Sequence, residues 1–119
     1  SMSHDHHNIV TVGACDEDMA LAVNTVAAMQ GGLCVVADGQ VLARMCLPIG
    51  GLMSECSAKE VIEELDKMNE AAKSLGCSGS APFMTLSFIS LPTVPELGLT
   101  DKGLIDVLGH QLMDVEETE

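Results

Sequence analysis

The residues best suited to metal binding or catalysis lie near the start of the chain, in the run His4-Asp5-His6-His7-Asn8. In an extended backbone alternate side chains share a face, so His4 and His6 point to one side while Asp5 and His7 point to the other. Two imidazoles on one face can share a metal ion, which makes His4 and His6 weak candidate metal ligands. The competing interpretation is a histidine-rich chain end without a metal.

Cysteine is the second reactive residue type, at five widely spaced positions without a Cys-x-x-Cys pair: Cys15, Cys34, Cys46, Cys56 and Cys77. An odd number of scattered cysteines is typical of a reduced protein, so we expect free, mostly buried thiols and a cytoplasmic location. Nothing in the sequence marks one of them as an activated nucleophile.

Polar residues near the end of the chain give a weaker signal. We interpret Asp101, Lys102, Asp106 and His110 as surface residues, because charged side chains are rarely buried without a partner. We expect no catalytic residue within these 119 positions.

Composition excludes two classes of partner. Eighteen acidic residues against five basic ones give a net charge of -13, which repels nucleic acid and anionic membrane surfaces. Residues 74–95 carry no charge, but glycines and prolines interrupt them, so we expect no membrane span. A hydrophobic fraction of 47% with only two Phe predicts a folded domain with an aliphatic, methionine-rich core.

Hydrophobic patterns predict the elements that must position these residues. In the first half we expect a short buried strand over residues 8–13, a helix with Asp16 as N-cap that ends before Gly31-Gly32, and a hairpin. The hairpin joins strands over residues 33–37 and 41–47 through the turn Asp38-Gly39.

The second half begins at an uncharged turn over residues 47–54. We expect Gly50 and Gly51 to form a buried structural turn, since glycine permits positive φ and close backbone approach. A capping box at Ser57 and Glu60 predicts a long helix that Gly76 ends. Alternation from Met84 onward then predicts a half-buried strand, with Thr85 and Ser87 on its polar face. Thr100 is expected to cap a short helix through Leu108.

The predicted order is therefore β-α-β-β-α-β. It indicates an α/β (α+β) fold in which helices pack on one mixed β-sheet. We expect residues 1–119 to form a single domain, with residues 1–7 flexible and residues 116–119 as an acidic tail.

Three segments, taken together, point to a known family. Residues 4–10 (HDHHNIV), 47–54 (LPIGGLMS) and 82–97 (PFMTLSFISLPTVPEL) resemble the C-terminal domain of bacterial-type adenine deaminase, and the likeness runs over nearly the whole chain. The corresponding family string is close to His-Asp-Ser-His-Asn, so His4, Asp5, His7 and Asn8 match it whereas His6 departs from serine.

The resemblance implies a function for a larger enzyme. Adenine deaminases hydrolyse adenine to hypoxanthine and ammonia in purine salvage, using a hydroxide on a divalent metal, manganese or iron, held by an amidohydrolase barrel. An eight-stranded α/β barrel needs about 250 residues, so the barrel is not within this chain. We therefore expect this domain to be inactive alone and to have the N-terminal barrel as its partner, with adenine reached through that barrel.

The same resemblance suggests a role for the N-terminal cluster. His4, Asp5 and His7 are candidate contributors to the active site of the full-length enzyme, and that enzyme is expected to be a homo-oligomer. The alternative is an independent module for small-ligand binding or oligomerisation that reuses the same fold.

Overall fold

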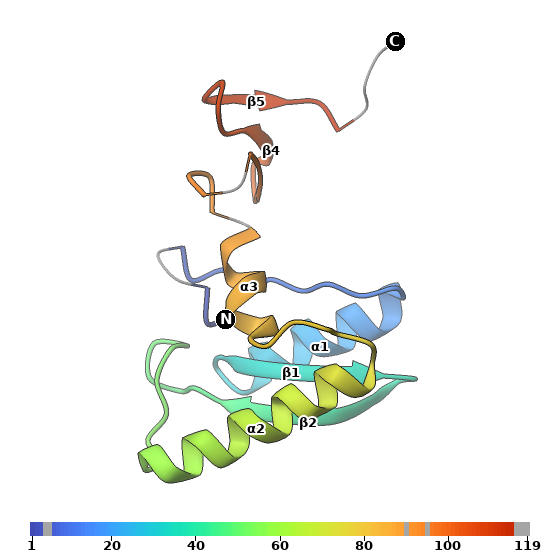
Figure 1. Ribbon diagram of the computed structural model, residues 1–119, viewed down its shortest axis with the longest axis vertical. Helices are drawn as coiled ribbons and strands as arrows, with labels where there is room; N and C mark the ends of the chain where they lie inside the picture. The colour runs from blue at the N-terminus through green and yellow to red at the C-terminus, as the bar shows by residue number, and fades with distance from the viewer. Residues whose placement is uncertain (4–5, 90, 95, 116–119) are drawn as a thin grey trace.

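The computed structural model describes residues 1–3, 6–89, 91–94 and 96–115 (Figure 1). Its elements follow the order α1, β1, β2, α2, α3, β3, β4, β5, and all the strand pairs in the described ranges are antiparallel. The predicted α+β class is confirmed. The predicted mixed sheet and the order β-α-β-β-α-β are wrong, because the strands form a hairpin and a separate three-stranded sheet.

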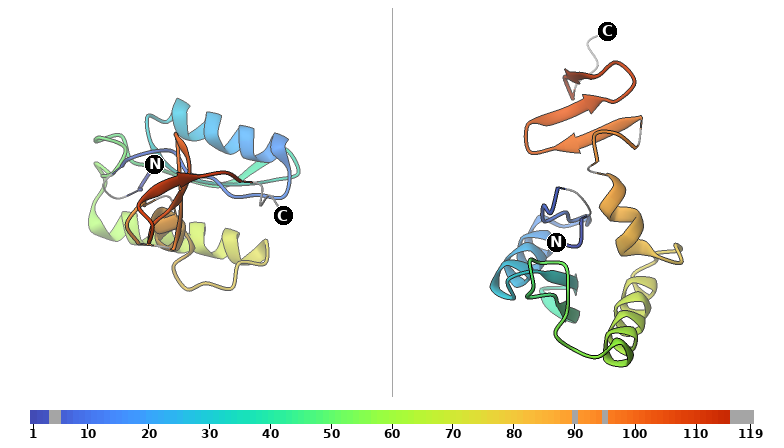
Figure 2. Two further views of the ribbon diagram at one scale, coloured as in Figure 1. Left: turned by 90° about the horizontal axis from the view of Figure 1, so that it is seen from above. Right: turned by 90° about the vertical axis from the view of Figure 1, so that its left-hand side faces the viewer.

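The body of the molecule has three layers. The hairpin of β1 (Gly32–Ala37) and β2 (Gln40–Cys46) lies between α1 (Asp16–Ala28) and α2 (Ala58–Ser74) (Figure 2). Side chains alternate across a strand, so one face of the hairpin meets each helix.

The core lies on the α2 side of the hairpin. It contains two methionines and three aliphatic residues, which confirms the predicted aliphatic, methionine-rich core: Leu33, Val35, Met45, Leu47 and Met68. Met68 is the most deeply enclosed of them, with 1% of its surface exposed.

The hairpin turn is confirmed in detail. Asp38 and Gly39 have φ values of 52° and 71°, the positive values that a type I′ turn requires at both central residues. The pairing runs in register from the turn to Cys46, with one irregularity between Val35 and Val36.

Helix α2 begins and ends as its sequence predicts. The Glu60 N–H donates to Ser57 Oγ at 3.5 Å, while the Ser57 N–H donates to Glu60 Oε2 at 2.9 Å, so the capping box is complete. At the other end Gly76 adopts φ 94° and the Cys77 N–H donates to the Ala72 carbonyl at 3.2 Å. This 6→1 bond satisfies a carbonyl of the last turn.

The ends of α1 differ from the prediction by one position each. Cys15, not Asp16, is the N-cap, and no side chain caps the helix there. At the C-terminal end the left-handed residue is Gln30 (φ 61°), and the Gly31 N–H donates to the Val26 carbonyl at 3.0 Å. The two glycines follow this cap and allow the chain to enter β1.

Residues 82–89 form helix α3 (Pro82–Ile89), so the predicted strand from Met84 is wrong. Proline is favoured in the first turn of a helix, where its missing N–H costs nothing. Thr85 Oγ1 donates to the Ala81 carbonyl at 3.1 Å and Ser87 Oγ to the Met84 carbonyl at 2.7 Å. The hydroxyls that suggested a polar strand face therefore bond back to the preceding helical turn.

The predicted helix from Thr100 to Leu108 is also wrong. This region forms the meander of β3 (Leu97–Thr100), β4 (Gly103–Asp106) and β5 (Gln111–Met113). Thr100 Oγ1 donates to the Gly103 carbonyl at 3.0 Å and accepts from the Lys102 N–H at 3.2 Å. Thr100 thus closes a β-turn instead of capping a helix.

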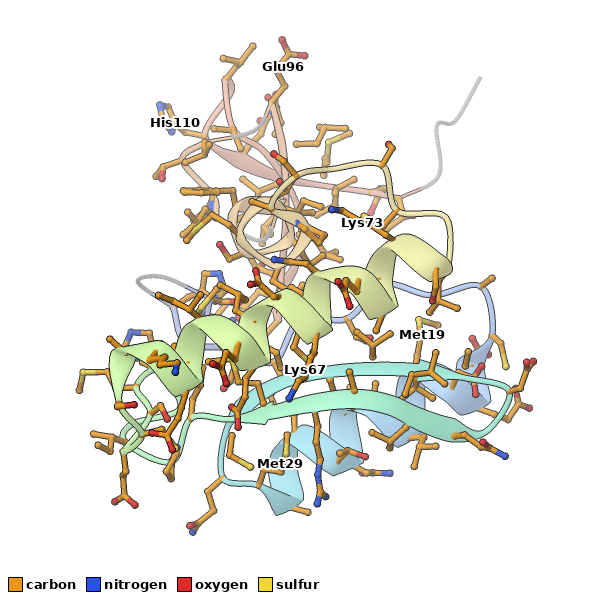
Figure 3. All side chains as sticks on the ribbon, turned by 60° about the horizontal axis from the view of Figure 1, so that its bottom comes forward. Met19, Met29, Lys67, Lys73, Glu96 and His110 are labelled. Atoms are coloured by element: carbon orange, nitrogen blue, oxygen red, sulfur yellow. The ribbon has the colours of Figure 1, made fainter. Side chains whose placement is uncertain are left out.

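The meander lies away from the three-layer body. Figure 3 shows Glu96 and His110 at one end of the molecule, and Met29 and Lys67 in the body at the other. The meander has a small core of its own, in which Gly98 lies against the Leu91 carbonyl and the Val107 side chain.

The turn over residues 47–54 is only partly buried. Gly50 and Gly51 adopt φ values of 65° and 76°, as a structural turn requires, but Gly50 is exposed, and so are Ile49 and Met53, which pair across the turn. Its buried contact is at Gly51, whose carbonyl accepts from Ser1 Oγ at 2.8 Å. The prediction of a buried turn is therefore wrong at Gly50, whereas Leu47 is buried and Gly51 is partly buried.

Residues 8–13 form neither a strand nor a helix, so the predicted first strand is wrong for this structure. Ile9 and Val12 are exposed. Among the described residues, no helix is long and apolar enough to cross a membrane.

Candidate functional site

The N-terminal cluster is only partly visible, because His4 and Asp5 lie outside the described residues. His6 Nδ1 accepts from the Asn8 N–H at 3.1 Å, so this nitrogen is already engaged. His7 has a positive φ of 53°, an exposed side chain, and an N–H that donates to the Ser3 carbonyl at 2.9 Å. Within the described ranges, no three His, Cys, Asp or Glu side chains gather closely enough to hold a metal.

Three of the four polar residues near the end of the chain are exposed, as predicted, and the fourth is partly buried. Asp101, Lys102 and His110 are exposed on the meander. Asp106 is half-buried, and its Oδ1 accepts from the Gly109 N–H at 2.9 Å, which closes the turn between β4 and β5. These four residues do not come together as a site.

The five cysteines are free thiols, as predicted, but they are not mostly buried: Cys15, Cys46 and Cys56 are exposed, and Cys34 and Cys77 are partly buried. Burial raises the pKa of the Cys34 thiol, while Thr25 and Arg44 act in the opposite direction. A raised pKa lowers the thiolate fraction, so Cys34 is not an activated nucleophile.

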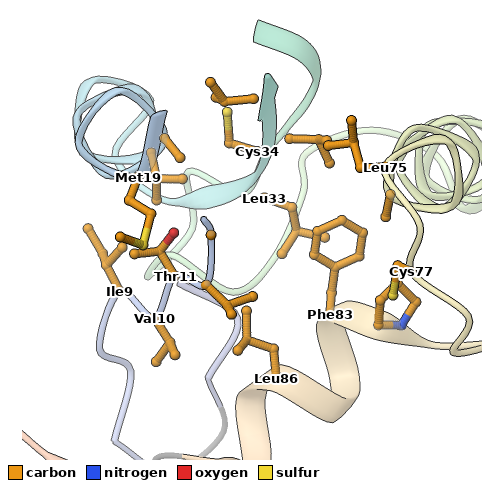
Figure 4. A pocket seen from close by; sticks show the side chains of 18 of the residues that line it. Ile9, Val10, Thr11, Met19, Leu33, Cys34, Leu75, Cys77, Phe83 and Leu86 are labelled. Atoms are coloured by element: carbon orange, nitrogen blue, oxygen red, sulfur yellow. The ribbon is translucent and has the colours of Figure 1, made fainter. Parts of the chain in front are cut away.

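The described part of the chain contains a large cavity of about 810 Å³. It lies between residues 9–15, α1, β1, the end of α2, and α3. Figure 4 shows Ile9, Val10 and Thr11 on one wall, with Leu33 and Phe83 across from them. We call this space the edge cavity, because β1 meets it along one side.

The edge cavity is suited to apolar contacts. Most of its walls are aliphatic, aromatic or sulfur-containing side chains, among them Met19, Leu75 and Leu86 (Figure 4). Convergent charged groups of the kind that orient a polar substrate are lacking on its described walls, where Asp18 is the sole carboxylate and binds the hairpin turn. The cavity could not be predicted from the sequence, because its walls come from segments that are far apart along the chain.

The second notable surface is one face of the meander. The register places Leu99, Leu104 and Met113 in one row across three strands, and Leu97 lies two residues from Leu99 on the same face. Leu97 and Leu99 are exposed, with 51% and 56% of their surfaces open. We call Leu97, Leu99, Leu104 and Met113 the meander face.

Apolar side chains of α3 add to the exposed area between the body and the meander. Met84, Phe88 and Ile89 are all exposed. Monomeric soluble proteins rarely leave large contiguous apolar patches open to water, so such surfaces commonly contact another domain or subunit.

Comparison with known proteins identifies relatives over the whole chain. The family described as the adenine deaminase C-terminal domain matches residues 1–111. An adenine deaminase from Desulforamulus reducens is 60% identical over 120 residues, which covers 100% of this chain and 20% of that protein. An adenine deaminase from Archaeoglobus fulgidus is 47% identical over 116 residues, covering 98% of this chain and 21% of that protein. This chain thus spans about a fifth of the length of these relatives.

Proposed function

Since the chain belongs to the adenine deaminase C-terminal domain family, we propose that it completes an enzyme that hydrolyses adenine to hypoxanthine and ammonia. The observation that carries this proposal is the match to about a fifth of each full-length relative. The metal-binding machinery then belongs to the remaining four fifths, and this domain contributes through contact with that part and through its N-terminal cluster.

The meander face is our proposed contact surface for that catalytic part. Leu97 and Leu99 leave an apolar strand face open to water, a situation that docking against another domain would relieve. The exposed side chains of α3 lie beside it in sequence and extend the same apolar character.

We propose that a catalytic metal is bound by the rest of such an enzyme and not by this chain. Adenine deamination by hydrolysis needs an activated water, which a divalent metal such as manganese or iron supplies. A catalytic metal usually has about three protein ligands, and no such group gathers within the described ranges. We assign no step to a metal bound by this domain.

The N-terminal cluster remains our proposed contribution to the active site of the complete enzyme. A carboxylate beside an imidazole can orient it and support proton transfer, which is the role we propose for Asp5 with His4 or His7. Replacing Asp5 by Asn or His7 by Ala in a complete enzyme should lower turnover by on the order of a hundredfold if either moves a proton. Near-normal turnover in both variants would leave the cluster a structural role only.

A chimera tests the proposed function directly. The matched segment of the Desulforamulus reducens adenine deaminase is replaced by this chain, and release of ammonia from adenine is measured. The chimera should retain turnover, whereas the same enzyme without the segment should lose it. Full activity of the shortened enzyme would contradict the proposal.

Two substitutions in the chimera locate the contact. Leu99→Asp places a charge on the meander face, and Leu112→Asp places the same charge on the opposite face of the meander, where Leu112 is 63% exposed. We expect Leu99→Asp to reduce turnover or to separate the domains, while Leu112→Asp leaves turnover within about twofold. Equal effects would rule out the meander face as the contact.

The exposed apolar surface also supports self-association of this domain, and the five free thiols support a cytoplasmic setting. Deamination of adenine by the complete enzyme would belong to purine salvage. Sedimentation at increasing concentration measures the association, and a constant monomer mass would contradict it. An edge cavity that stays open in solution would favour a second candidate function, a module that binds small apolar ligands.

A further inference from the structure

Strand β1 pairs with β2 along one edge and meets the edge cavity along the other. The Leu47 N–H donates to the Gly31 carbonyl at 3.1 Å, so Gly31 turns its carbonyl toward β2. Orientation alternates along an antiparallel strand, so Leu33 and Val35 also turn toward β2. The backbone N–H and C=O groups of Gly32, Cys34 and Val36 therefore point away from β2, toward the cavity.

Both ends of this outward edge are already closed. At the start, the Ser1 ammonium donates to the Gly32 carbonyl at 2.8 Å, and the Gly32 N–H donates to Ser1 Oγ at 2.9 Å. At the far end, the Asp38 N–H donates to Asp18 Oδ2 at 3.1 Å. These bonds also verify the alternation, since Gly32 and Asp38 both face outward.

Four backbone groups remain between these closed ends, the N–H and C=O of Cys34 and of Val36. They have no hydrogen-bond partner within the described part of the chain. An unpaired edge beside an apolar cavity is a template for another strand, because a strand supplies both the missing partners and apolar side chains.

Residues 9–13 meet the requirements of that strand. They line the edge cavity opposite β1, and they run in the same direction as β1 before the chain turns into α1 (Figure 1). Their sequence, Ile-Val-Thr-Val-Gly, is β-branched and uncharged, the composition that favours a strand. Helix α1 then provides the crossover that a parallel β-α-β connection needs.

We propose that residues 9–13 dock on the free edge of β1 as a parallel third strand and so close the edge cavity. In a parallel pair each outward residue bonds to two residues of its neighbour, two positions apart. Cys34 and Val36 together therefore engage about five consecutive residues, which is the length of this segment. The structure holds the segment in an undocked arrangement, with its apolar side chains on the far wall of the cavity (Figure 4).

Docking has a consequence for the N-terminal cluster. His6, His7 and Asn8 directly precede the segment, so a docked strand fixes the point from which these side chains project. This inference concerns the free chain and stands independently of the proposed deaminase function.

Amide hydrogen exchange on the 119-residue chain tests the proposal at single residues. With the strand docked, the Cys34 and Val36 amides should exchange within about tenfold of the rates at Leu33 and Val35, which bond to β2. Exchange at Cys34 and Val36 more than about a hundredfold faster than at Leu33 and Val35 would overturn the proposal.

A pair of proline variants makes the test specific for a strand. Only alternate residues of a docked strand donate an N–H to β1, and proline has no N–H to donate. Val10→Pro and Thr11→Pro therefore act as matched controls for each other. One of the two variants should keep the exchange protection of the Cys34 and Val36 amides within about threefold of that in the parent chain. The other variant should reduce this protection by about a hundredfold or more. Equal loss of protection would show a segment without strand pairing.

An apolar dye separates docking from an open ligand site. The neutral dye Nile red should bind the proline variant that loses protection and should not bind the parent chain, because docking fills the cavity. Strong binding of Nile red to the parent, at one dye per chain, would overturn the proposal in favour of a persistent cavity. Urea titration of each variant confirms that it is folded before either measurement is interpreted.

Discussion

Asp18, in the first turn of α1, holds the tip of the hairpin through Gly39. Its Oδ1 accepts from the Gly39 N–H at 2.8 Å, and its Oδ2 accepts from the Asp38 N–H at 3.1 Å. A carboxylate in the first turn of a helix also interacts favourably with the helix dipole. One side chain therefore joins the start of α1 to the end of β1, across 21 positions of sequence.

We predict that Asp18→Ala destabilises the domain by about 1 to 2 kcal/mol, because two backbone donors lose a charged acceptor. The matched control is Asp16→Ala, which removes a carboxylate from the same helical turn but no bond to the hairpin. The control should cost about 0.5 kcal/mol, from the helix dipole alone. Urea unfolding measures both values, and equal losses would contradict a specific role for Asp18.

Because Met68 lies in the core, we predict a larger loss of stability when it is replaced. With 1% of its surface exposed, Met68 fills the space between α2 and the hairpin, so Met68→Ala should cost about 2 to 5 kcal/mol. Ile62→Ala in the same helix, where 59% of the side chain is exposed, should cost less than about 1 kcal/mol. A difference below about 1 kcal/mol between these variants would mean that α2 does not pack as described.

The hairpin and α2 were predictable from sequence because their signals are local. Asp38-Gly39 specifies a turn by backbone conformation, and the Ser57 and Glu60 pair specifies a helix start by direct hydrogen bonds. Neither signal depends on distant packing, so both survive in the folded chain.

The wrong secondary-structure predictions concern short segments whose sequences are compatible with both a helix and a strand or turn. Residues 82–89 alternate as a strand would, yet eight residues of high hydrophobicity fit a short helix equally well, and Pro82 favours the helix. Thr100 can cap a helix or close a turn, and the pairing of β3 with β4 decided the outcome. The edge cavity was beyond sequence reasoning, since only the fold brings its walls together.

Two glycines with positive φ should differ sharply when replaced by alanine. A Cβ at Gly31 (φ 120°) would collide with the backbone of Gly51, whereas a Cβ at Gly50 (φ 65°) would meet open space. Gly50→Ala should cost about 1 kcal/mol from backbone strain alone. Gly31→Ala should cost about 3 kcal/mol or more, because the contact between the two turns must open. Thermal unfolding compares them, and similar melting temperatures would argue against the close approach.

Thiol reactivity should follow burial. Burial raises the pKa of the Cys34 thiol, so its thiolate fraction near neutral pH is reduced, whereas Cys15, Cys46 and Cys56 are open to reagent. We expect iodoacetamide to label Cys34 at least about tenfold more slowly than these three, as followed by peptide mass spectrometry. Labelling in denaturant should make all the rates similar. Fast labelling of Cys34 in the folded chain would contradict its placement beside α1.

The capping box of α2 should make stability depend on pH through Glu60. Hydrogen bonds from the Ser57 side chain (2.7 Å) and then from its backbone N–H (2.9 Å) lower the pKa of the Glu60 carboxyl below its ordinary value of 4.5. A group whose pKa is lower in the folded state stabilises the fold above its unfolded pKa, and this stabilisation is lost as the pH falls through the folded value.

Glu60→Gln removes the titrating group but keeps an oxygen that can accept from Ser57. We therefore expect the parent to be more stable than Glu60→Gln at about pH 7, and the difference to shrink steadily between about pH 5 and about pH 3. Glu17, whose pKa is lowered by the Cys15 thiol at 3.0 Å, titrates in both proteins, so its contribution cancels in the difference. Urea unfolding at a series of pH values measures the two free energies. A difference that stays constant with pH would show that Glu60 does not cap α2 as a carboxylate, and a difference that grows on acidification would contradict the sign of the pKa shift.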